Sequence, residues 1–306
     1  MKKISVIVPC YNEEETINLF FEALTSFWKD NLSDHELEAV FIDDGSKDNT
    51  LLLIRALADK HDSVRYGSFS RNFGKEAAMF AGLELCTGDC AVVIDADLQH
   101  PVETIKDMAD KWNEGFDVIE GIKSTRGKEA KSHSLFANMF YGIISSLIGF
   151  DMRNSSDFKL IDRKVIDVLL TFTEKDTFFR ALTFWSGFKS TSVEYEVKER
   201  SAGSSKWSGF SLVKYAFRNI LAFTYTPLYL IAILGVLVIL IGLYMGVDAV
   251  ITYFKGESVG GYPSLVILIT LSTGAILSSL GIVSIYLSKV FNEVKNRPRF
   301  IFREHN

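Results

Sequence analysis

The sequence predicts an α/β domain with a mostly parallel sheet, followed by a helical hairpin that crosses a membrane. Over residues 4–121, short apolar runs alternate with stretches of helical periodicity, a pattern typical of repeated β-α-β units. Two later segments, between Arg218 and Asp248 and from Ser258 to Ser288, contain no charged residue. Each exceeds the roughly 20 residues that a helix needs to cross the hydrocarbon of a bilayer.

The apolar runs and the periodic stretches predict the elements of the first part in order. Strands are expected at 4–8, 37–42, 64–69, 90–94 and 116–121, and helices at 14–29, 48–59, 75–85 and 101–112. In the first helix, apolar residues from Ile17 to Phe27 recur at the helical period. Pro101 stands at the start of the last helix, where proline is favoured. Strands this apolar require helices on both faces of the sheet.

Composition excludes several classes of protein. With 48% hydrophobic and 23% charged residues, the chain of 306 residues is not disordered and allows one or two domains. Three cysteines do not make a disulfide scaffold, and a net charge of −5 gives no support to nucleic-acid binding. The absence of a P-loop and of Gly-x-Gly-x-x-Gly after the first strand disfavours P-loop NTPases and dinucleotide dehydrogenases. The five histidines are scattered, which disfavours a zinc site.

Charge is divided unevenly along the chain. From Lys198 onward, 11 Lys and Arg stand against 5 Asp and Glu, a charge of +6 that leaves −11 for residues 1–197. Most of these basic residues precede the first apolar segment or follow the second, so the positive-inside rule places both ends of the hairpin in the cytoplasm. We expect a cytoplasmic domain at 1–206, a juxtamembrane amphipathic helix at 207–226, and a transmembrane hairpin with a basic cytoplasmic tail at 227–306. Its spans are expected at about 227–249 and 264–288. A pair of buried helices in a soluble core is the less favoured alternative.

Polar clusters follow four of the predicted strands, at 11–15, 43–48, 70–75 and 95–101. In parallel sheets, ligands bind beyond the carboxyl ends of the strands, so these clusters predict one ligand site. Asp95 and Asp97 can reach a single divalent ion, and Gln99 can add a neutral oxygen. Such hard oxygen ligands favour Mg²⁺ or Mn²⁺, which commonly bind substrate phosphates as well.

Four motifs in combination resemble the family 2 inverting glycosyltransferases of GT-A fold: 5–14 (SVIVPCYNEE), 41–48 (FIDDGSKD), 71–75 (RNFGK) and 95–101 (DADLQHP). The chain is most similar to the polyprenyl-phosphate glycosyltransferases, which include dolichyl-phosphate mannose synthase and the bacterial bactoprenol glucosyltransferases. The resemblance covers essentially the whole chain. It implies a GT-A domain that uses a nucleotide sugar and a polyprenyl (undecaprenyl) phosphate in a bacterial plasma membrane, for cell-surface glycan modification.

The resemblance also implies roles for individual residues. Pro9, Tyr11 and Glu13 would line the nucleoside pocket, Asp44 would contact the base, and Asp95 would face the nucleoside and sugar. Asp97, with Gln99 and Asp95, would hold the catalytic metal. Pro9 and Tyr11 also suit turn and packing roles, and Asp43 suits a cap of the turn before the next helix.

Asp157, in the segment 154–163, matches the proposed catalytic carboxylate of the family. A phosphate acceptor with a second pKa near ~6 is already largely anionic at neutral pH and needs no deprotonation. Asp157 is therefore expected either to act as a general base or to orient the sugar or the acceptor, with an N-cap-like role as the structural alternative.

Basic residues are expected to bind the phosphates: Lys123 on the donor, and Arg126, Arg200 and Lys206 on the donor diphosphate or the acceptor. Lys128 and Lys131 fit solvated charges or lipid-headgroup contacts. The segment 200–207 differs from the Gln-x-x-Arg-Trp pattern of processive synthases, which favours transfer of one sugar per acceptor. The stretch 207–222 has the pattern of an interfacial helix, and 132–150 fits either an interfacial helix or domain core.

Several alternatives stay open. The resemblance favours UDP-glucose as donor, with UDP-N-acetylglucosamine, UDP-galactose and GDP-mannose as the others. Readings of another class are a non-catalytic membrane scaffold and a transporter, although two spans without internal charge leave little room for a substrate path. Glycines in both spans could pack between subunits, and the resemblance suggests a homo-oligomer such as a tetramer.

Overall fold

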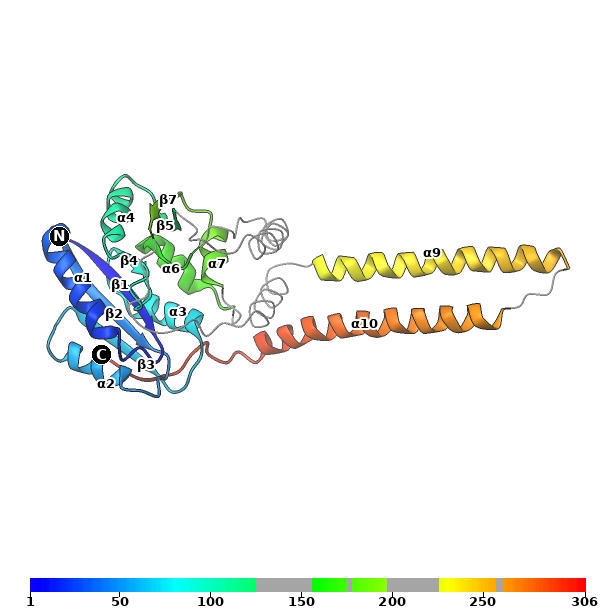
Figure 1. Cartoon of the computed structure of the whole chain (residues 1–306), viewed down its shortest axis with the longest axis horizontal. Helices are drawn as coiled ribbons and strands as arrows, with labels where there is room; N and C mark the ends of the chain where they lie inside the picture. The colour runs from blue at the N-terminus through cyan, green and yellow to red at the C-terminus, as the bar shows by residue number, and fades with distance from the viewer. Residues whose placement is uncertain (125–155, 175–177, 197–225, 257–260) are drawn as a thin grey trace. The chain divides into compact units, whose positions relative to one another are not determined.

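The computed structural model describes residues 1–124, 156–174, 178–196, 226–256 and 261–306. The chain divides into two units, Met1–Ser208 together with Pro298–Asn306, and Gly209–Arg297. The first unit holds an α/β domain, and the second holds two long helices (Figure 1). The predicted amphipathic helix at 207–226, except its last residue, lies outside the described residues, as do the stretch 132–150 and Arg126, Arg200 and Lys206.

One sheet of eight described strands organises the first unit, in the order β7-β5-β6-β4-β1-β2-β3-β8. The strands are β1 (Lys2–Cys10), β2 (His35–Asp43), β3 (Val64–Phe69), β4 (Cys90–Val93), β5 (Val118–Lys123), β6 (Lys159–Asp162), β7 (Ser190–Tyr195) and β8 (Phe302–His305). Of these eight, only β6 and β8 run against the common direction. The predicted α/β class with a mostly parallel sheet is confirmed.

Helices cover both faces of the sheet. They are α1 (Ile17–Asn31), α2 (Thr50–Ala58), α3 (Lys75–Leu85), α4 (Thr104–Asn113), α6 (Arg163–Thr171) and α7 (Phe179–Trp185). Alternate residues of β1 point to opposite sides. Val6 belongs to one buried cluster with residues of α1 and α4 such as Leu24. Ile7 faces α3 so closely that a Cβ on Gly82 would lie 2.2 Å from its Cγ2 atom.

The observed bounds differ from the predicted ones in ways that local hydrogen bonds explain. The first helix begins at Ile17 rather than 14, because a turn precedes it in which the Thr16 amide donates to the Glu13 carbonyl at 3.0 Å. The Thr104 amide likewise bonds the Pro101 carbonyl at 3.2 Å, so Pro101 starts the turn before α4. β3 and α3 have the predicted bounds. The elements β7, β8, α6 and α7 have no counterpart among the predicted strands and helices.

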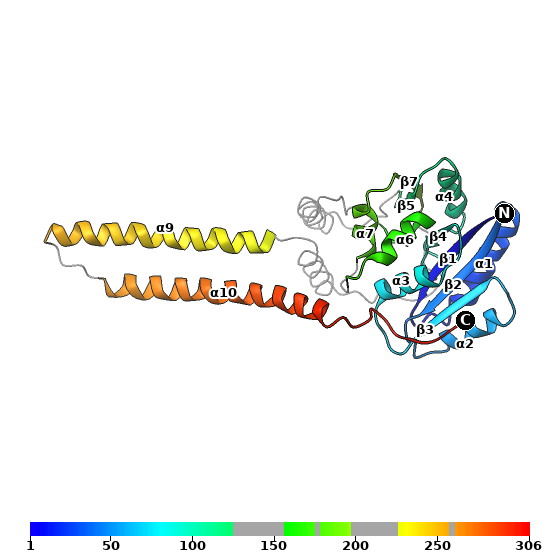
Figure 2. The same cartoon turned by 180° about the vertical axis from the view of Figure 1, so that it is seen from behind.

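The carboxyl-terminal segment belongs to the α/β unit. β8 adds antiparallel to β3, with Gly67 opposite His305, and the two can be followed side by side in Figure 2. Phe300 stacks on Phe69 with ring centroids 5.1 Å apart, and Glu304 pairs with Arg55. The last residues of the predicted basic tail thus cover an edge of the sheet, which would otherwise expose unpaired backbone groups.

The second unit consists of α9 (Thr226–Phe254) and α10 (Tyr262–Val294), which run antiparallel and side by side. Within them, Ile233–Phe254 and Ile267–Val294 are long and apolar enough to cross a membrane, and the most apolar window of each is entirely unburied. Exposure of side chains such as Ile239 (67%) and Leu243 (65%) distinguishes these helices from the core helices of a soluble domain.

Candidate active site

The sheet topology gathers the predicted polar clusters. β1, β2, β3 and β4 are parallel, so the segments that follow them leave the same edge of the sheet. β6 runs the opposite way, so its first residue lies at that edge, and Asp157 stands two residues before it. The antiparallel strand thereby brings Asp157 to the loop that carries Asp95.

Lys75, at the start of α3, joins the two carboxylates. Its Nζ atom lies 2.6 Å from Oδ1 of Asp95 and 3.1 Å from Oδ2 of Asp157. Arg180 of α7 approaches Asp157 from the other side, with Nε at 2.6 Å from Oδ1 and Nη2 at 3.1 Å from Oδ2. Asp157 is only 15% exposed. We call Lys75, Asp95, Asp157 and Arg180 the charged cluster.

The environment of Asp157 bears on its chemistry. Burial by itself would raise the pKa of Asp157, but the charges of Lys75 and Arg180 hold that pKa well below its usual range. A carboxylate that is so hard to protonate is a weak general base. The geometry therefore favours the second of the two predicted roles, in which Asp157 orients other groups.

Three members of the site had no role in the sequence analysis. Lys75 was only part of the motif 71–75, and Arg180 and Glu76 were not singled out. Glu76 accepts a hydrogen bond from the Phe179 amide at 2.8 Å, and burial together with the nearby charge of Asp157 raises its pKa to about 7. The one available signal for Arg180 was its position as a lone cation in an apolar stretch, 178–182.

Asp44 and Asp43 organise the loops of the predicted nucleoside end. Asp44 is buried and accepts hydrogen bonds from the amides of Phe73 (2.6 Å) and Gly74 (2.9 Å). Burial raises the pKa of Asp44 to about 6. Asp43 caps the turn before α2, as anticipated, by accepting from the Ser46 amide at 3.0 Å. The contact of Asp44 with a base stays a prediction.

Gly45 follows these two carboxylates in a backbone conformation with φ +67°, which favours glycine. A Cβ there would lie 2.6 Å from the carbonyl carbon of Arg71. The turn after β2 is thus pressed against the loop at 71–74, and a larger residue would separate them.

Pro9, Tyr11 and Glu13 lie at the end of β1 and in the turn after it. β1 continues one residue past Pro9, to Cys10. The Glu13 carboxylate accepts from the Thr16 hydroxyl at 2.9 Å, whereas Tyr11 is 38% exposed. Of the three, Tyr11 presents the surface on which a base could stack.

The predicted metal ligands lie on one tight turn after β4. Oδ1 of Asp97 accepts from the Gln99 amide at 3.1 Å, and Leu98 between them has φ 58°. Among the residues that the structure describes, no three His, Cys, Asp or Glu side chains are grouped as a metal site. Two carboxylates and one amide oxygen fit Mg²⁺ or Mn²⁺ as a partial shell, of the kind that substrate phosphates and water complete.

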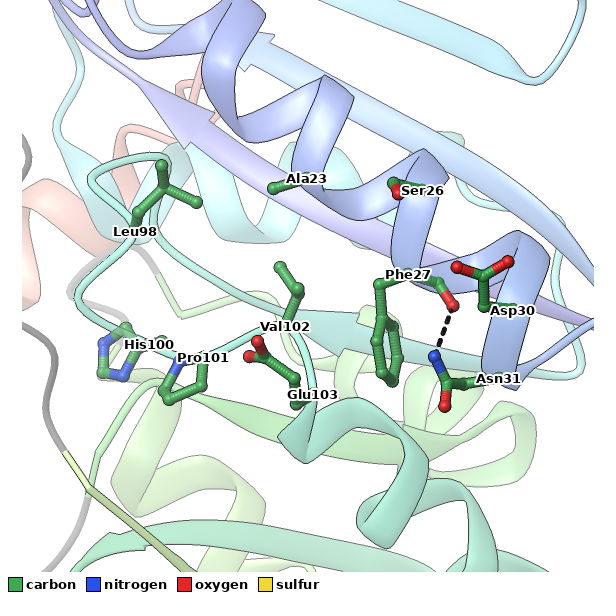
Figure 3. Close-up of a pocket in the computed structure, with 10 residues that line it drawn as sticks. All are labelled: Ala23, Ser26, Phe27, Asp30, Asn31, Leu98, His100, Pro101, Val102 and Glu103. Atoms are coloured by element: carbon green, nitrogen blue, oxygen red, sulfur yellow. Dashed lines mark hydrogen bonds between the residues drawn. The ribbon is translucent and has the colours of Figure 1, made fainter.

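The remaining predicted donor residue, Lys123, is exposed at the end of β5, in register with Tyr195 at the end of β7. Near this edge, a pocket of about 500 Å³ opens between α1 and the segment 98–103 (Figure 3). Its wall carries His100 and the acidic side chains Asp30 and Glu103. The described residues that line this pocket include no Lys or Arg, so its chemistry does not favour a phosphate group.

Comparison with known proteins gives a consistent result. Residues 5–169 match glycosyl transferase family 2. The SfII prophage-derived bactoprenol glucosyl transferase of Shigella flexneri is 37% identical over 304 residues, which cover 99% of this chain and 98% of that protein. The prophage bactoprenol glucosyl transferase homolog of Escherichia coli strain K12 is 36% identical over 303 residues, 98% of each chain.

Among solved structures, glucosyl-3-phosphoglycerate synthase of Mycobacterium tuberculosis in complex with Mn²⁺, uridine diphosphate and phosphoglyceric acid aligns with a TM-score of 0.48 and 20% identity. The alignment covers 72% of this chain and 77% of that one. The family match and the sheet described above confirm the expected GT-A-like fold. From its motifs, its sheet and its full-length relatives, the chain belongs to glycosyl transferase family 2 and is a glycosyltransferase of the group that includes the bactoprenol glucosyl transferases.

Proposed function

We propose that this protein transfers one glucose from UDP-glucose to polyprenyl (undecaprenyl) phosphate on the cytoplasmic face of a bacterial plasma membrane, for modification of cell-surface glycans. The observation that carries the proposal is the charged cluster beside Asp97 and Gln99 at the carboxyl edge of the sheet. The names of the full-length relatives support glucose and a polyprenyl acceptor. The two apolar helices support membrane attachment.

The reaction is an in-line displacement at the anomeric carbon. An oxygen of the lipid phosphate forms a bond to that carbon, and the bond from the carbon to the β-phosphate oxygen breaks. Nucleoside diphosphate leaves with the electron pair, and the configuration inverts. Because the attacking phosphate is already largely anionic, with a second pKa near ~6, no proton has to be removed.

The residues of the charged cluster have separate tasks in this proposal. Lys75 and Arg180 present positive charge to the donor diphosphate, where negative charge increases during the displacement. Asp157 is a positioning residue that holds both cations in place. Asp97, Gln99 and Asp95 would hold Mg²⁺ or Mn²⁺, which supplies further charge stabilisation on the diphosphate when bound.

The other parts of the chain follow from the same proposal. Residues 1–206 form the cytoplasmic catalytic domain, with Pro9, Tyr11, Glu13, Asp44 and Lys123 on the donor. Arg126, Arg200 and Lys206 bind the donor diphosphate or the acceptor phosphate. The hairpin at 227–306 anchors the enzyme with both ends in the cytoplasm. Homo-oligomers, such as a tetramer, form through glycine faces such as that of Gly242 and Gly246, where a Cβ would meet nothing within 4 Å.

A panel of nucleotide sugars tests the proposal. The full-length protein in detergent is incubated with undecaprenyl phosphate, Mg²⁺ or Mn²⁺, and UDP-glucose, UDP-N-acetylglucosamine, UDP-galactose or GDP-mannose, and the products are identified by mass. We expect a glucosyl lipid from UDP-glucose only when the lipid phosphate is present. Release of UDP at the same rate without the lipid would contradict the acceptor assignment.

A pair of matched variants tests the metal site. Asp97→Ala should abolish transfer while leaving the protein folded, whereas Asp62→Ala, at an exposed position before β3, should leave transfer unchanged. Chelation of divalent ions should stop the wild-type reaction, and added Mg²⁺ or Mn²⁺ should restore it. Near wild-type turnover of Asp97→Ala would refute the metal role.

A further inference from the structure

We propose that the Tyr195 hydroxyl and the His100 imidazole form a polar subsite that hydrogen-bonds a hydroxyl group of the donor sugar and so selects which sugar is transferred. This inference rests on the proposed function and assigns part of its specificity to two residues. Neither residue was a candidate in the sequence analysis.

The first observation is that each of the two side chains is enclosed and has one polar atom without a partner. Tyr195 is 4% exposed and the His100 side chain 14%. Within the described part of the chain, the Tyr195 hydroxyl and Nδ1 of His100 are buried atoms with no hydrogen-bond partner. Buried polar groups in folded proteins are almost always paired, so two unpaired ones indicate a ligand or an ordered water.

The second observation is that the two groups are neighbours held by one aromatic ring. The rings of His100 and Tyr195 have centroids 5.3 Å apart. Phe158 packs against both, at 5.0 Å from His100 and 5.5 Å from Tyr195. Phe158 is itself buried, so its packing holds both rings in place.

The third observation is the place of the pair beside the charged cluster. Nε2 of His100 lies 3.8 Å from Oδ2 of Asp95. Phe158 directly follows Asp157 in the chain. Tyr195 ends β7 opposite Lys123, at the sheet edge to which the charged cluster belongs. A group bound by Tyr195 and His100 is therefore adjacent to the residues assigned to the diphosphate.

The chemistry of the pair fits a sugar hydroxyl better than a phosphate. A phenol and an imidazole each donate or accept a hydrogen bond, which matches a hydroxyl group that does both. The phosphates of the donor are assigned to Lys75 and Arg180, which pair with Asp95 and Asp157 in the charged cluster. A site built to bond a hydroxyl rejects sugars that lack it, because its own buried groups are then left unpaired.

Tyr195→Phe is the test variant, because it removes only the unpaired oxygen. The matched control is Tyr66→Phe on β3, near the opposite edge of the sheet. Both are made in the full-length protein and assayed with undecaprenyl phosphate and UDP-glucose, and with a series of donors that each lack one sugar hydroxyl. UDP affinity and melting temperature are measured alongside.

We expect Tyr195→Phe to lower kcat/KM for the parent donor by at least about tenfold, with UDP affinity unchanged and the melting temperature unchanged or raised. With wild type, one of the deoxy donors should show a kcat/KM lower than that of the parent donor by a similar factor. With Tyr195→Phe, that deoxy donor and the parent donor should have the same kcat/KM. His100→Asn, which keeps a polar atom near the position of Nδ1, should retain more activity than His100→Leu. Tyr66→Phe should keep the wild-type kcat/KM with every donor.

Other outcomes overturn the inference. If Tyr195→Phe keeps kcat/KM within about twofold of wild type, the hydroxyl binds only water and the subsite does not exist. If removal of each sugar hydroxyl lowers kcat/KM by the same factor in the variant and in wild type, Tyr195 does not bind a hydroxyl of the sugar. If wild type transfers no sugar from any nucleotide donor to the lipid, the proposed function itself fails and the inference with it.

Discussion

Glu76 offers the sharpest test of the electrostatics at the charged cluster. Its carboxyl group accepts from the Phe179 amide at 2.8 Å and lies near the negative charge of Asp157. Burial and that charge raise its pKa from the ordinary value of 4.5 to about 7. Replacement by glutamine keeps an oxygen that can accept the same hydrogen bond and removes the ionisation.

The sign of the effect follows from proton binding in the two states. Between pH 4.5 and about pH 7, the unfolded chain has released this proton while the folded protein retains it. Stability therefore falls as the pH rises through that window and is constant above it. At about 1.4 kcal/mol for each pH unit, ionisation of Glu76 costs the folded protein at most ~3 kcal/mol at pH 8.

Glu76→Gln should therefore match wild type near pH 4.5 and be more stable at pH 8. For a domain of this size, ~3 kcal/mol corresponds to a rise in melting temperature of roughly 6–12 °C, and the observed rise should not exceed this. The assay is thermal unfolding of the full-length protein in detergent at several pH values. Glu84→Gln, an exposed position on the same helix, is the control. An equal pH dependence for Glu76→Gln and wild type would refute the assigned pKa.

Three further predictions concern other parts of the molecule. Asp157→Asn and Arg180→Ala should each lower kcat by about 100-fold or more, and the double variant should lose little more, because Asp157 acts by holding the cation. Additive losses in the double variant would favour a general base instead. So would an acidic limb of the pH–rate profile that disappears only in Asp157→Asn. Gly82→Ala should lower the melting temperature, because overpacking against β1 typically costs about 1–3 kcal/mol, against a helix gain of at most ~1 kcal/mol. An unchanged melting temperature would contradict this packing. Deletion of residues 300–306 should lower the melting temperature by removing β8 and uncovering the edge of the sheet, and an unchanged value would show that β8 does not stabilise the domain.

Much of the local architecture could be predicted because its causes are local. The apolar runs of β1 to β5 and the periodic helices between them were located to within a few residues. The candidate ligands Asp95, Asp97 and Gln99 were identified because they follow a buried strand. Asp44 was placed at the correct edge of the sheet, but its hydrogen bonds to the 73–74 backbone depend on a loop about 30 residues away, and no spacing in the sequence revealed them.

By itself, the sequence determined the α/β class, the edge of the sheet at which the polar loops gather and the two apolar helices, because periodicity and hydropathy act over short stretches of chain. Only the tertiary structure decided which charges meet. The ion pairs of Lys75 with Asp157, and of Asp157 with Arg180, depend on the reversed direction of β6, a strand placed between parallel neighbours by pairing across the sheet. The contact of Tyr195 with His100 is likewise set by the tertiary structure, because it joins two segments far apart in the chain. Pairing between distant segments leaves no periodic trace in either of them.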